Sequence, residues 1–242
     1  LRLREELRTA EETPPTAAEA ARFLPLMKPY VHAEDVRLQV KWSASELKRL
    51  REEREEGLSA PLFSLPQDGG SEVAAQRGTA YHKLFERIDF TRSWTEEGLR
   101  DFLKELAETG ALPEEDGALI ALPPVIRFLQ SALAARLASA QRAGTLHRET
   151  SFVMAIPARE VDPSRLSEEP VVVQGVIDAW FEEGGQLVLL DYKTDKSTEE
   201  THYREKYTAQ LSLYARALAM TEEKTVAEKL IYATARGEVL AL

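Results

Sequence analysis

The segment from Gln174 to Lys193 decides the fold: Gln174-Gly-Val-Ile-Asp-Ala-Trp-Phe-Glu-Glu-Gly-Gly-Gln-Leu-Val-Leu-Leu-Asp-Tyr-Lys193. Its two apolar runs meet at Gly184-Gly185, which indicates a β-hairpin with a two-residue loop. Counting outward from that loop places Asp178 directly opposite Asp191. The Cβ atoms of opposed residues lie about 4.5–5.5 Å apart, where like charges are destabilising. We therefore expect a cation between these two carboxylates.

Side chains two residues apart on a strand share a face, so Lys193 is expected on the same side as Asp191. One interpretation is a structural ion pair between the two. However, both runs are apolar on both faces, which is typical of central strands. A carboxylate pair there costs free energy unless a metal or hydrogen bonds compensate. Hard oxygen ligands favour Mg²⁺, with Mn²⁺ as a substitute, and Lys193 would then orient the attacking water or stabilise developing negative charge.

The rest of the chain predicts an α/β fold with a mixed central sheet flanked by helices. Apolar residues at three- and four-residue spacing indicate helices, and runs rich in β-branched and aromatic residues indicate strands. A helical insertion is expected between the helix that carries His82 and the first core strand. The predicted helices are 43–57, capped by Ser43 or Ser45, then 71–88, 95–109, 114–141 with an interruption at Pro123-Pro124, and 199–220; the predicted strands are 148–156, 171–182, 187–193 and 229–234.

Composition excludes several classes of site. The 242 residues include no cysteine, which rules out disulfides, thiolate zinc sites, cysteine nucleophiles and a cysteine-bound iron–sulfur cluster. The chain has neither an apolar run long enough for a membrane span nor a signal peptide, so we expect a soluble, cytoplasmic protein. The formal net charge of −10 is the opposite of the basic footprint of most nucleic-acid-binding proteins. No phosphate-cradling GxxxxGK[ST] motif is present.

Four short motifs occur in the order of a known family. Gly175-Val-Ile-Asp178, Asp191-Tyr-Lys193-Thr, Gln210-Leu-Ser-Leu-Tyr214 and Gly78-Thr-Ala-Tyr-His82 resemble the GxxD, DYKT, QxxxY and GxxxH motifs of RecB-like PD-(D/E)XK nucleases. Each motif alone is weak, but the set is specific. The resemblance implies a restriction-endonuclease-like fold and metal-dependent hydrolysis of DNA to 5′-phosphate ends.

The resemblance also implies roles for individual residues. His82, Asp178, Asp191 and the backbone carbonyl of Tyr192 would bind the metal, and Lys193 would be catalytic. A lone histidine in a helix is more often a packed or surface residue, so the interpretation of His82 depends on its motif. His32, His147 and His202 have no such context.

Other polar residues allow two interpretations each. Gln210 and Tyr214 share one helix face, which by the resemblance borders the active site. Glu149 is either an ordinary strand-end charge or a support for Lys193 or a second metal. The same helix carries four residues before Gln210 that would offer stacking and phosphate contacts to a single strand: Tyr203, Arg204, Lys206 and Tyr207. An amphipathic core face explains the two tyrosines equally well.

The missing cysteines favour the AddA-type branch, because the related AddB-type and Cas4-type nucleases carry cysteines for an iron–sulfur cluster. Ser43-Ala-Ser-Glu-Leu and Arg148-Glu149-Thr-Ser-Phe also resemble AddA-type segments. Residues 41–242 would then form the nuclease domain, helical over 41–141 and with the sheet core at 145–242. Residues 1–40 would be a connecting segment, the tail of a helicase motor in the same chain.

The implied partners are single-stranded DNA delivered by that motor and an AddB-type subunit, and the implied process is the repair of double-strand breaks by recombination. Two alternatives remain: a catalytically silent domain that binds DNA or a partner, and a stand-alone nuclease. The four intact motifs disfavour the silent domain. The sequence begins with Leu1 rather than Met, which fits a fragment of a longer chain, whereas a native gene that begins at or near Leu1 would support the stand-alone nuclease.

Overall fold

The computed structural model describes residues 39–47, 69–161, 168–197 and 199–242. The chain divides into two compact units, residues 1–39 and 40–242, and all the described helices and strands belong to the second. Nearly all of the predicted connecting segment 1–40, His32 included, lies outside the described residues. So does the predicted end of the first helix near Gly57.

The hairpin forms as the sequence predicts. Strands β3 (Pro170–Glu183) and β4 (Gln186–Lys193) are antiparallel, and Ala179 pairs with Leu190. Asp178 and Asp191 come next in that register. The loop residues Gly184 and Gly185 have φ angles of 60° and 80°, a conformation that glycine adopts at little cost.

The sheet is mixed and divides around the long strand β3. Strand β2 (Leu146–Pro157) pairs antiparallel with β3 from Pro170 to Phe181 and so fills one edge. The other edge is shared by β1 (Lys41–Ser43), parallel to residues 172–174, and β4, antiparallel to residues 179–183. Residues 175–178 lie between these two partners. Strands β5 (Val226–Ala233) and β6 (Glu238–Ala241) extend the sheet beyond β4.

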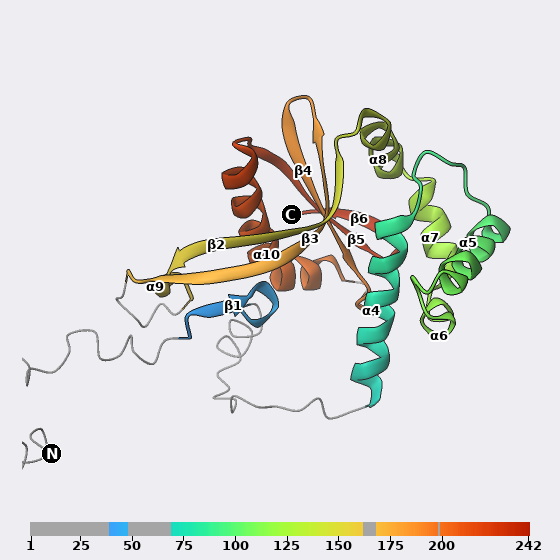
Figure 1. Cartoon of the computed structure of the whole chain (residues 1–242), viewed down its shortest axis with the longest axis horizontal. Coiled ribbons are helices and arrows are strands. Elements are labelled where there is room, and N and C mark those ends of the chain that lie inside the picture. The colour runs from blue at the N-terminus through green and yellow to red at the C-terminus, as the bar shows by residue number, and fades with distance from the viewer. Residues whose placement is uncertain (1–38, 48–68, 162–167, 198) are drawn as a thin grey trace, which may run out of the picture. The chain divides into compact units, whose positions relative to one another are not determined.

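Helices cover both sides of the sheet, which confirms the predicted α/β class. Helix α10 (Glu200–Glu222) connects the parallel strands β4 and β5 and packs on both. Helix α4 (Gly69–Arg87) lies on the other side, next to the cluster of α5 to α8 (Figure 1). That cluster consists of α5 (Glu96–Glu108), α6 (Glu114–Gly117), α7 (Leu122–Leu129) and α8 (Ala132–Ala143); the single-turn helix α9 (Ala158–Val161) follows β2.

Aromatic packing fixes which way β4 faces. Tyr192 stacks on Phe85 of α4 with ring centroids 4.3 Å apart, and Phe128 of α7 stacks on Tyr232 of β5 at 4.2 Å. Because side chains alternate along a strand, the neighbours of Tyr192 point away from this core. The aromatic cluster thus directs Asp191 and Lys193 toward α10.

One expectation about element boundaries was wrong, and two short strands were not predicted. The prolines at 123 and 124 begin α7 instead of interrupting a helix, because the first turn needs no N–H from them. The helix ends at Leu129 with Gln130 as its C-cap, and Ser131 caps α8 by accepting from the N–H of Ala134. Strands β1 and β6, of 3 and 4 residues, were not predicted because such short strands show no measurable periodicity.

Ser43, one of the two predicted caps, begins the helical turn at 44–47. Its hydroxyl accepts from the Glu46 N–H at 3.1 Å, and the Glu46 carboxylate accepts from the Ser43 N–H at 2.7 Å. This reciprocal pair is a capping box. Separately, none of the described helices is long and apolar enough to span a membrane.

Candidate metal centre

A cavity of about 590 Å³ lies where β1 and β4 diverge along β3. The cavity is walled by the turn after β1, the strands β2 to β4 and helix α10. It brings together six predicted site residues from four elements: His82, Asp178, Asp191, Lys193, Gln210 and Tyr214.

Asp178 links the α4 histidine to the backbone of β4. One carboxylate oxygen, Oδ1, lies 3.3 Å from His82 Nδ1, and Oδ2 accepts from the N–H of Tyr192 at 2.8 Å. The other ring nitrogen, His82 Nε2, lies 3.1 Å from the carbonyl oxygen of Tyr192. His82 therefore contacts two of the three other donor groups that the resemblance assigned to the metal, Asp178 and the Tyr192 carbonyl. The phenol of Tyr192 points into the aromatic core, and its hydroxyl has no hydrogen-bond partner among the described residues.

Asp191 and Lys193 form a buried ion pair beside this group. The Lys193 ammonium lies 2.6 Å from Asp191 Oδ2, with the two side chains 14% and 1% exposed. That oxygen is buried and receives no well-directed hydrogen bond from the described residues. The ion pair is the contact that the structural interpretation predicted, but its setting includes a second and a third carboxylate.

Glu149 supplies the third carboxylate. On β2 it stands between Arg148, which pairs with Ala179, and Thr150, which pairs with Ile177; Glu149 therefore lies across from Asp178. Its φ angle is 48°, a left-handed conformation that costs free energy for a residue other than glycine. Ligand atoms of His82, Glu149 and Asp178 lie within 4.8 Å of one another.

The electrostatics of the site show strong mutual influence. Burial raises the pKa of Asp191 to about 6, although Lys193 opposes the rise. Burial also acts to raise the pKa of Asp178, but His82 and Lys193 outweigh it and hold that pKa below its usual value. Burial lowers the pKa of His82, yet Asp178 raises it above normal. Burial and the charge of Asp178 raise the pKa of Glu149.

The donor set fits a hard divalent cation. Three carboxylates face one ammonium and one imidazole, so the site lacks positive charge when the acids are ionised. Carboxylate and carbonyl oxygens are the ligands that Mg²⁺ and Mn²⁺ favour. A cation bound here would relieve the repulsion between Asp178 and its neighbours.

A family model described as the PD-(D/E)XK nuclease superfamily matches residues 39–240. The chain belongs to this superfamily. It is also 33% identical over 202 residues, 69% of the chain, to an ATP-dependent helicase/nuclease subunit of Lachnoclostridium phytofermentans. The corresponding subunit of Bacillus licheniformis is 32% identical over 232 residues, 87% of the chain. The chain spans only 15% and 19% of the length of these two relatives.

The superfamily motif on α10 is buried rather than exposed. Gln210 donates to the Tyr214 hydroxyl at 2.8 Å, and both side chains line the cavity. The suggestion that two preceding tyrosines stack on DNA bases was wrong: Tyr203 is 0% and Tyr207 3% exposed. Arg204 pairs with Glu200 on its own helix. The core-face interpretation of these tyrosines is the correct one.

The two motif glycines have different structural roles, which predicts opposite effects of alanine. A Cβ on Gly175 would lie 2.7 Å from the ring of Phe152, its cross-strand partner, and 3.3 Å from Ala44. A Cβ on Gly78, inside α4, would meet Thr194 at an ordinary 3.5 Å. We expect Gly175→Ala to reduce the free energy of unfolding by about 1–3 kcal/mol through overpacking. Gly78→Ala should raise it by about 0.5–1 kcal/mol through helix propensity.

Denaturant unfolding of the two variants and the wild type measures this difference. Each variant is the matched control for the other, since both replace a motif glycine by alanine. Equal destabilisation by the two substitutions would contradict the packing role assigned to Gly175.

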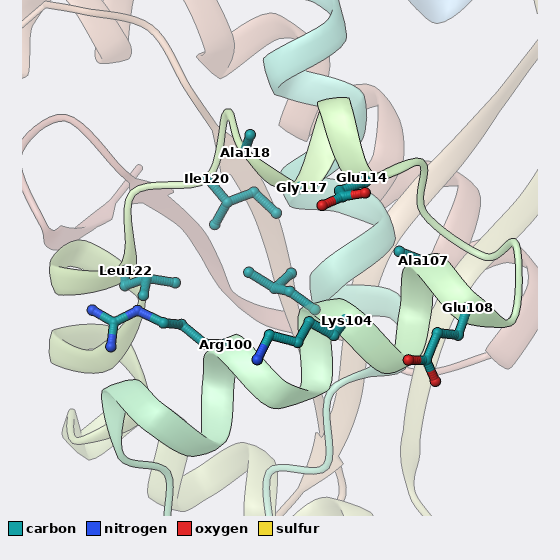
Figure 2. Close-up of a pocket in the computed structure, with 10 residues that line it drawn as sticks. Arg100, Lys104, Ala107, Glu108, Glu114, Gly117, Ala118, Ile120 and Leu122 are labelled. Carbon is teal, nitrogen blue, oxygen red and sulfur yellow. The ribbon is translucent and has the colours of Figure 1, made fainter.

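A second cavity, of about 470 Å³, lies among the helices between α5 and the α6–α7 segment. Figure 2 shows Arg100 and Lys104 on α5 at its edge, with Ile120 and Leu122 across from them. The two cations pair with acids of their own helix, Arg100 with Glu96 and Lys104 with Asp101. Among the described residues, the potential metal-binding group of three or more ligands lies at His82 and not here.

Some features of the site were not predictable from the motifs. Glu149 lies opposite Asp178 because of the register between β2 and β3. The segment that joins these strands is too long for the register to be predicted by counting residues outward from a tight loop. The cavity also includes Val153 and residues 43–45. Residues 43–45 belong to a segment that resembles AddA-type proteins, but the resemblance assigned them no role in the site.

Proposed function

We propose that this chain is the metal-dependent deoxyribonuclease domain of a bacterial helicase-nuclease, hydrolysing phosphodiester bonds as an exonuclease. One observation carries the proposal. In a chain of the PD-(D/E)XK superfamily, the elements α4, β3 and β4 bring His82, Asp178, Asp191 and Lys193 to a single cavity. A catalytically silent relative would have no need to keep this combination.

The residues of the site have two roles, metal binding and the stabilisation of negative charge on the phosphate. His82, Asp178, Asp191 and the Tyr192 carbonyl would hold Mg²⁺, or Mn²⁺ in its place, and Glu149 lies close enough to His82 and Asp178 to support them. Such an ion, when bound, lowers the pKa of a coordinated water and offsets charge on the phosphate.

Lys193 and the two α10 residues form the remaining wall. The Lys193 ammonium borders the cavity in which the scissile phosphate would lie, and there it stabilises negative charge that develops on the phosphate oxygens. The pKa of Lys193 lies above its usual value, since the nearby carboxylates outweigh the effect of burial; the side chain therefore acts as a cation. Gln210 and Tyr214, linked by their hydrogen bond, contact the reacting strand or hold Lys193 in place.

The wider role rests on the relatives. Because they are named as ATP-dependent helicase/nuclease subunits and are much longer than this chain, we propose that a helicase motor in the same polypeptide feeds single-stranded DNA to the cavity. An AddB-type subunit would complete the assembly, and its task in the bacterial cytoplasm would be the processing of double-strand breaks for recombinational repair.

The test is cleavage of an end-labelled single-stranded oligonucleotide by the purified chain. We expect slow cleavage with Mg²⁺ or Mn²⁺, products with 5′-phosphate ends, no cleavage in EDTA and no response to ATP. Lys229→Ala, which removes a lysine of β5 that does not line the cavity, is the matched control for Lys193→Ala and should retain activity. If Lys193→Ala cleaves as fast as the wild type, a contaminating nuclease or a different site is responsible.

A further inference from the structure

The ring of Tyr207 lies against the lysine of the site. The Lys193 ammonium sits 4.7 Å from the centroid of this ring, within the range of a cation–π contact. The tyrosine is on α10, one turn before Gln210, and is only 3% exposed. The ring is therefore unable to stack on DNA, and its closest functional neighbour is the lysine.

Asp195 holds the ring in that position. The Tyr207 hydroxyl donates to Asp195 Oδ2 in a short hydrogen bond. The other oxygen of Asp195 accepts from Lys206 at 2.7 Å and lies 3.6 Å from His202 Nε2. Asp195 follows Lys193 by two residues, so the same segment that carries the lysine also fixes the ring beneath it.

The backbone around Asp195 is itself anchored. The Tyr203 hydroxyl donates to the carbonyls of Asp195 and Ser197 at 3.2 and 3.0 Å. Arg77 of α4 donates to the carbonyl of Thr194 at 3.0 Å. Contacts from helices on both sides of the sheet therefore hold this segment, and a ring attached to it has little freedom to shift.

The ring matters because the other contact of the ammonium is not permanent. Lys193 pairs with Asp191 Oδ2, and a cation bound by Asp191 competes for the same carboxylate. A lysine side chain has four rotatable bonds and becomes free to reorient when its ion-pair partner is withdrawn. The aromatic face of Tyr207 stays in contact with the ammonium both when Asp191 pairs with Lys193 and when Asp191 binds a metal ion.

We propose that Tyr207, held by Asp195, is a positioning residue that keeps the ammonium of Lys193 directed into the cavity through its aromatic face. This inference rests on the proposed nuclease function. It assigns the last residue of the Asp191-Tyr-Lys193-Thr-Asp195 run, which the metal site does not use, to holding that ring in place.

The kinetic test separates the ring from the hydroxyl. Tyr207→Leu removes the aromatic face and should lower kcat for a single-stranded oligonucleotide about tenfold, or about 1.4 kcal/mol, with KM and Mn²⁺ affinity unchanged. Tyr207→Phe keeps the aromatic face but loses the hydrogen bond to Asp195, and it should retain kcat within about threefold. Asp195→Asn keeps the face and only weakens that hydrogen bond, so it should lose no more activity than Tyr207→Phe. Leu218→Ala, which shortens an equally buried side chain of the same helix that does not line the cavity, is the control: it should lower the melting temperature and leave kcat near that of the wild type.

A spectroscopic readout does not depend on cleavage. In ¹³C-lysine-labelled protein, the ε-CH₂ protons of Lys193, assigned with Lys193→Arg, should be shifted upfield by the ring current of Tyr207. The shift should remain in Tyr207→Phe and disappear in Tyr207→Leu. A wild-type Lys193 signal at an ordinary position, or equal kcat losses in Tyr207→Leu and Leu218→Ala, would overturn the proposal. Absence of any cleavage alongside a clear ring-current shift would instead refute the proposed function and leave the Tyr207–Lys193 contact established.

Discussion

Asp191→Asn and Lys193→Met should both reduce cleavage at least about 10³-fold, yet they should change stability in opposite directions. The pKa of Asp191 is raised to about 6, which means that the fold disfavours the charged form of this carboxylate. Removing that charge should therefore leave the metal-free protein as stable as the wild type or more stable. Removing the Lys193 cation leaves the carboxylates of Asp178 and Asp191 without a neutralising charge between them. This should lower the free energy of unfolding by about 3 kcal/mol.

Thermal unfolding of the two variants in EDTA, at neutral pH, measures the stability effect, and the oligonucleotide assay measures cleavage. A large fall in the melting temperature of Asp191→Asn would mean that the pair with Lys193 exists to stabilise the fold. The structural ion-pair interpretation would then be correct. Adding Mn²⁺ should raise the melting temperature of the wild type but not that of Asp191→Asn.

The isolated chain should bind single-stranded DNA very weakly, with a dissociation constant near or beyond about 10⁻⁴ M at physiological salt. The reason is its net charge of −10, since affinity for nucleic acid comes mainly from phosphates neutralised by Lys and Arg. A linked motor would compensate, because a short tether gives an effective concentration on the order of millimolar.

Fluorescence anisotropy with labelled oligonucleotide and the inactive Asp191→Asn variant measures the affinity. Fusing the chain to an unrelated single-strand-binding module should then raise cleavage at low DNA concentration about 10²-fold and leave the rate at saturating DNA unchanged. Tight binding by the unfused variant would show that delivery by a tether is not needed.

The sequence alone determined the central hairpin, whose observed register sets Ala179 opposite Leu190 as predicted and brings Asp178 and Asp191 to the same end of the strand pair. This succeeded because the two-residue Gly184-Gly185 loop leaves one register, so a count along the chain becomes a position in space. The amphipathic patterns of α4, α5 and α10 were likewise predictable within a few residues. Each of these signals is local: the residues that carry it are close in the chain as well as in the fold.

The tertiary structure alone decided the contacts that residues of other segments make around Asp178, Asp191 and Lys193. Glu149 opposes Asp178 because β2 aligns with β3 across a connection too long to set the register. His82 reaches Asp178 because α4 packs on the aromatic face of β4 through Phe85 and Tyr192. Tyr207 lies against Lys193 because α10 covers the opposite face. These contacts join segments that are distant in the sequence, and side-chain packing between the segments sets them. The periodicity or residue spacing within one segment does not encode such packing.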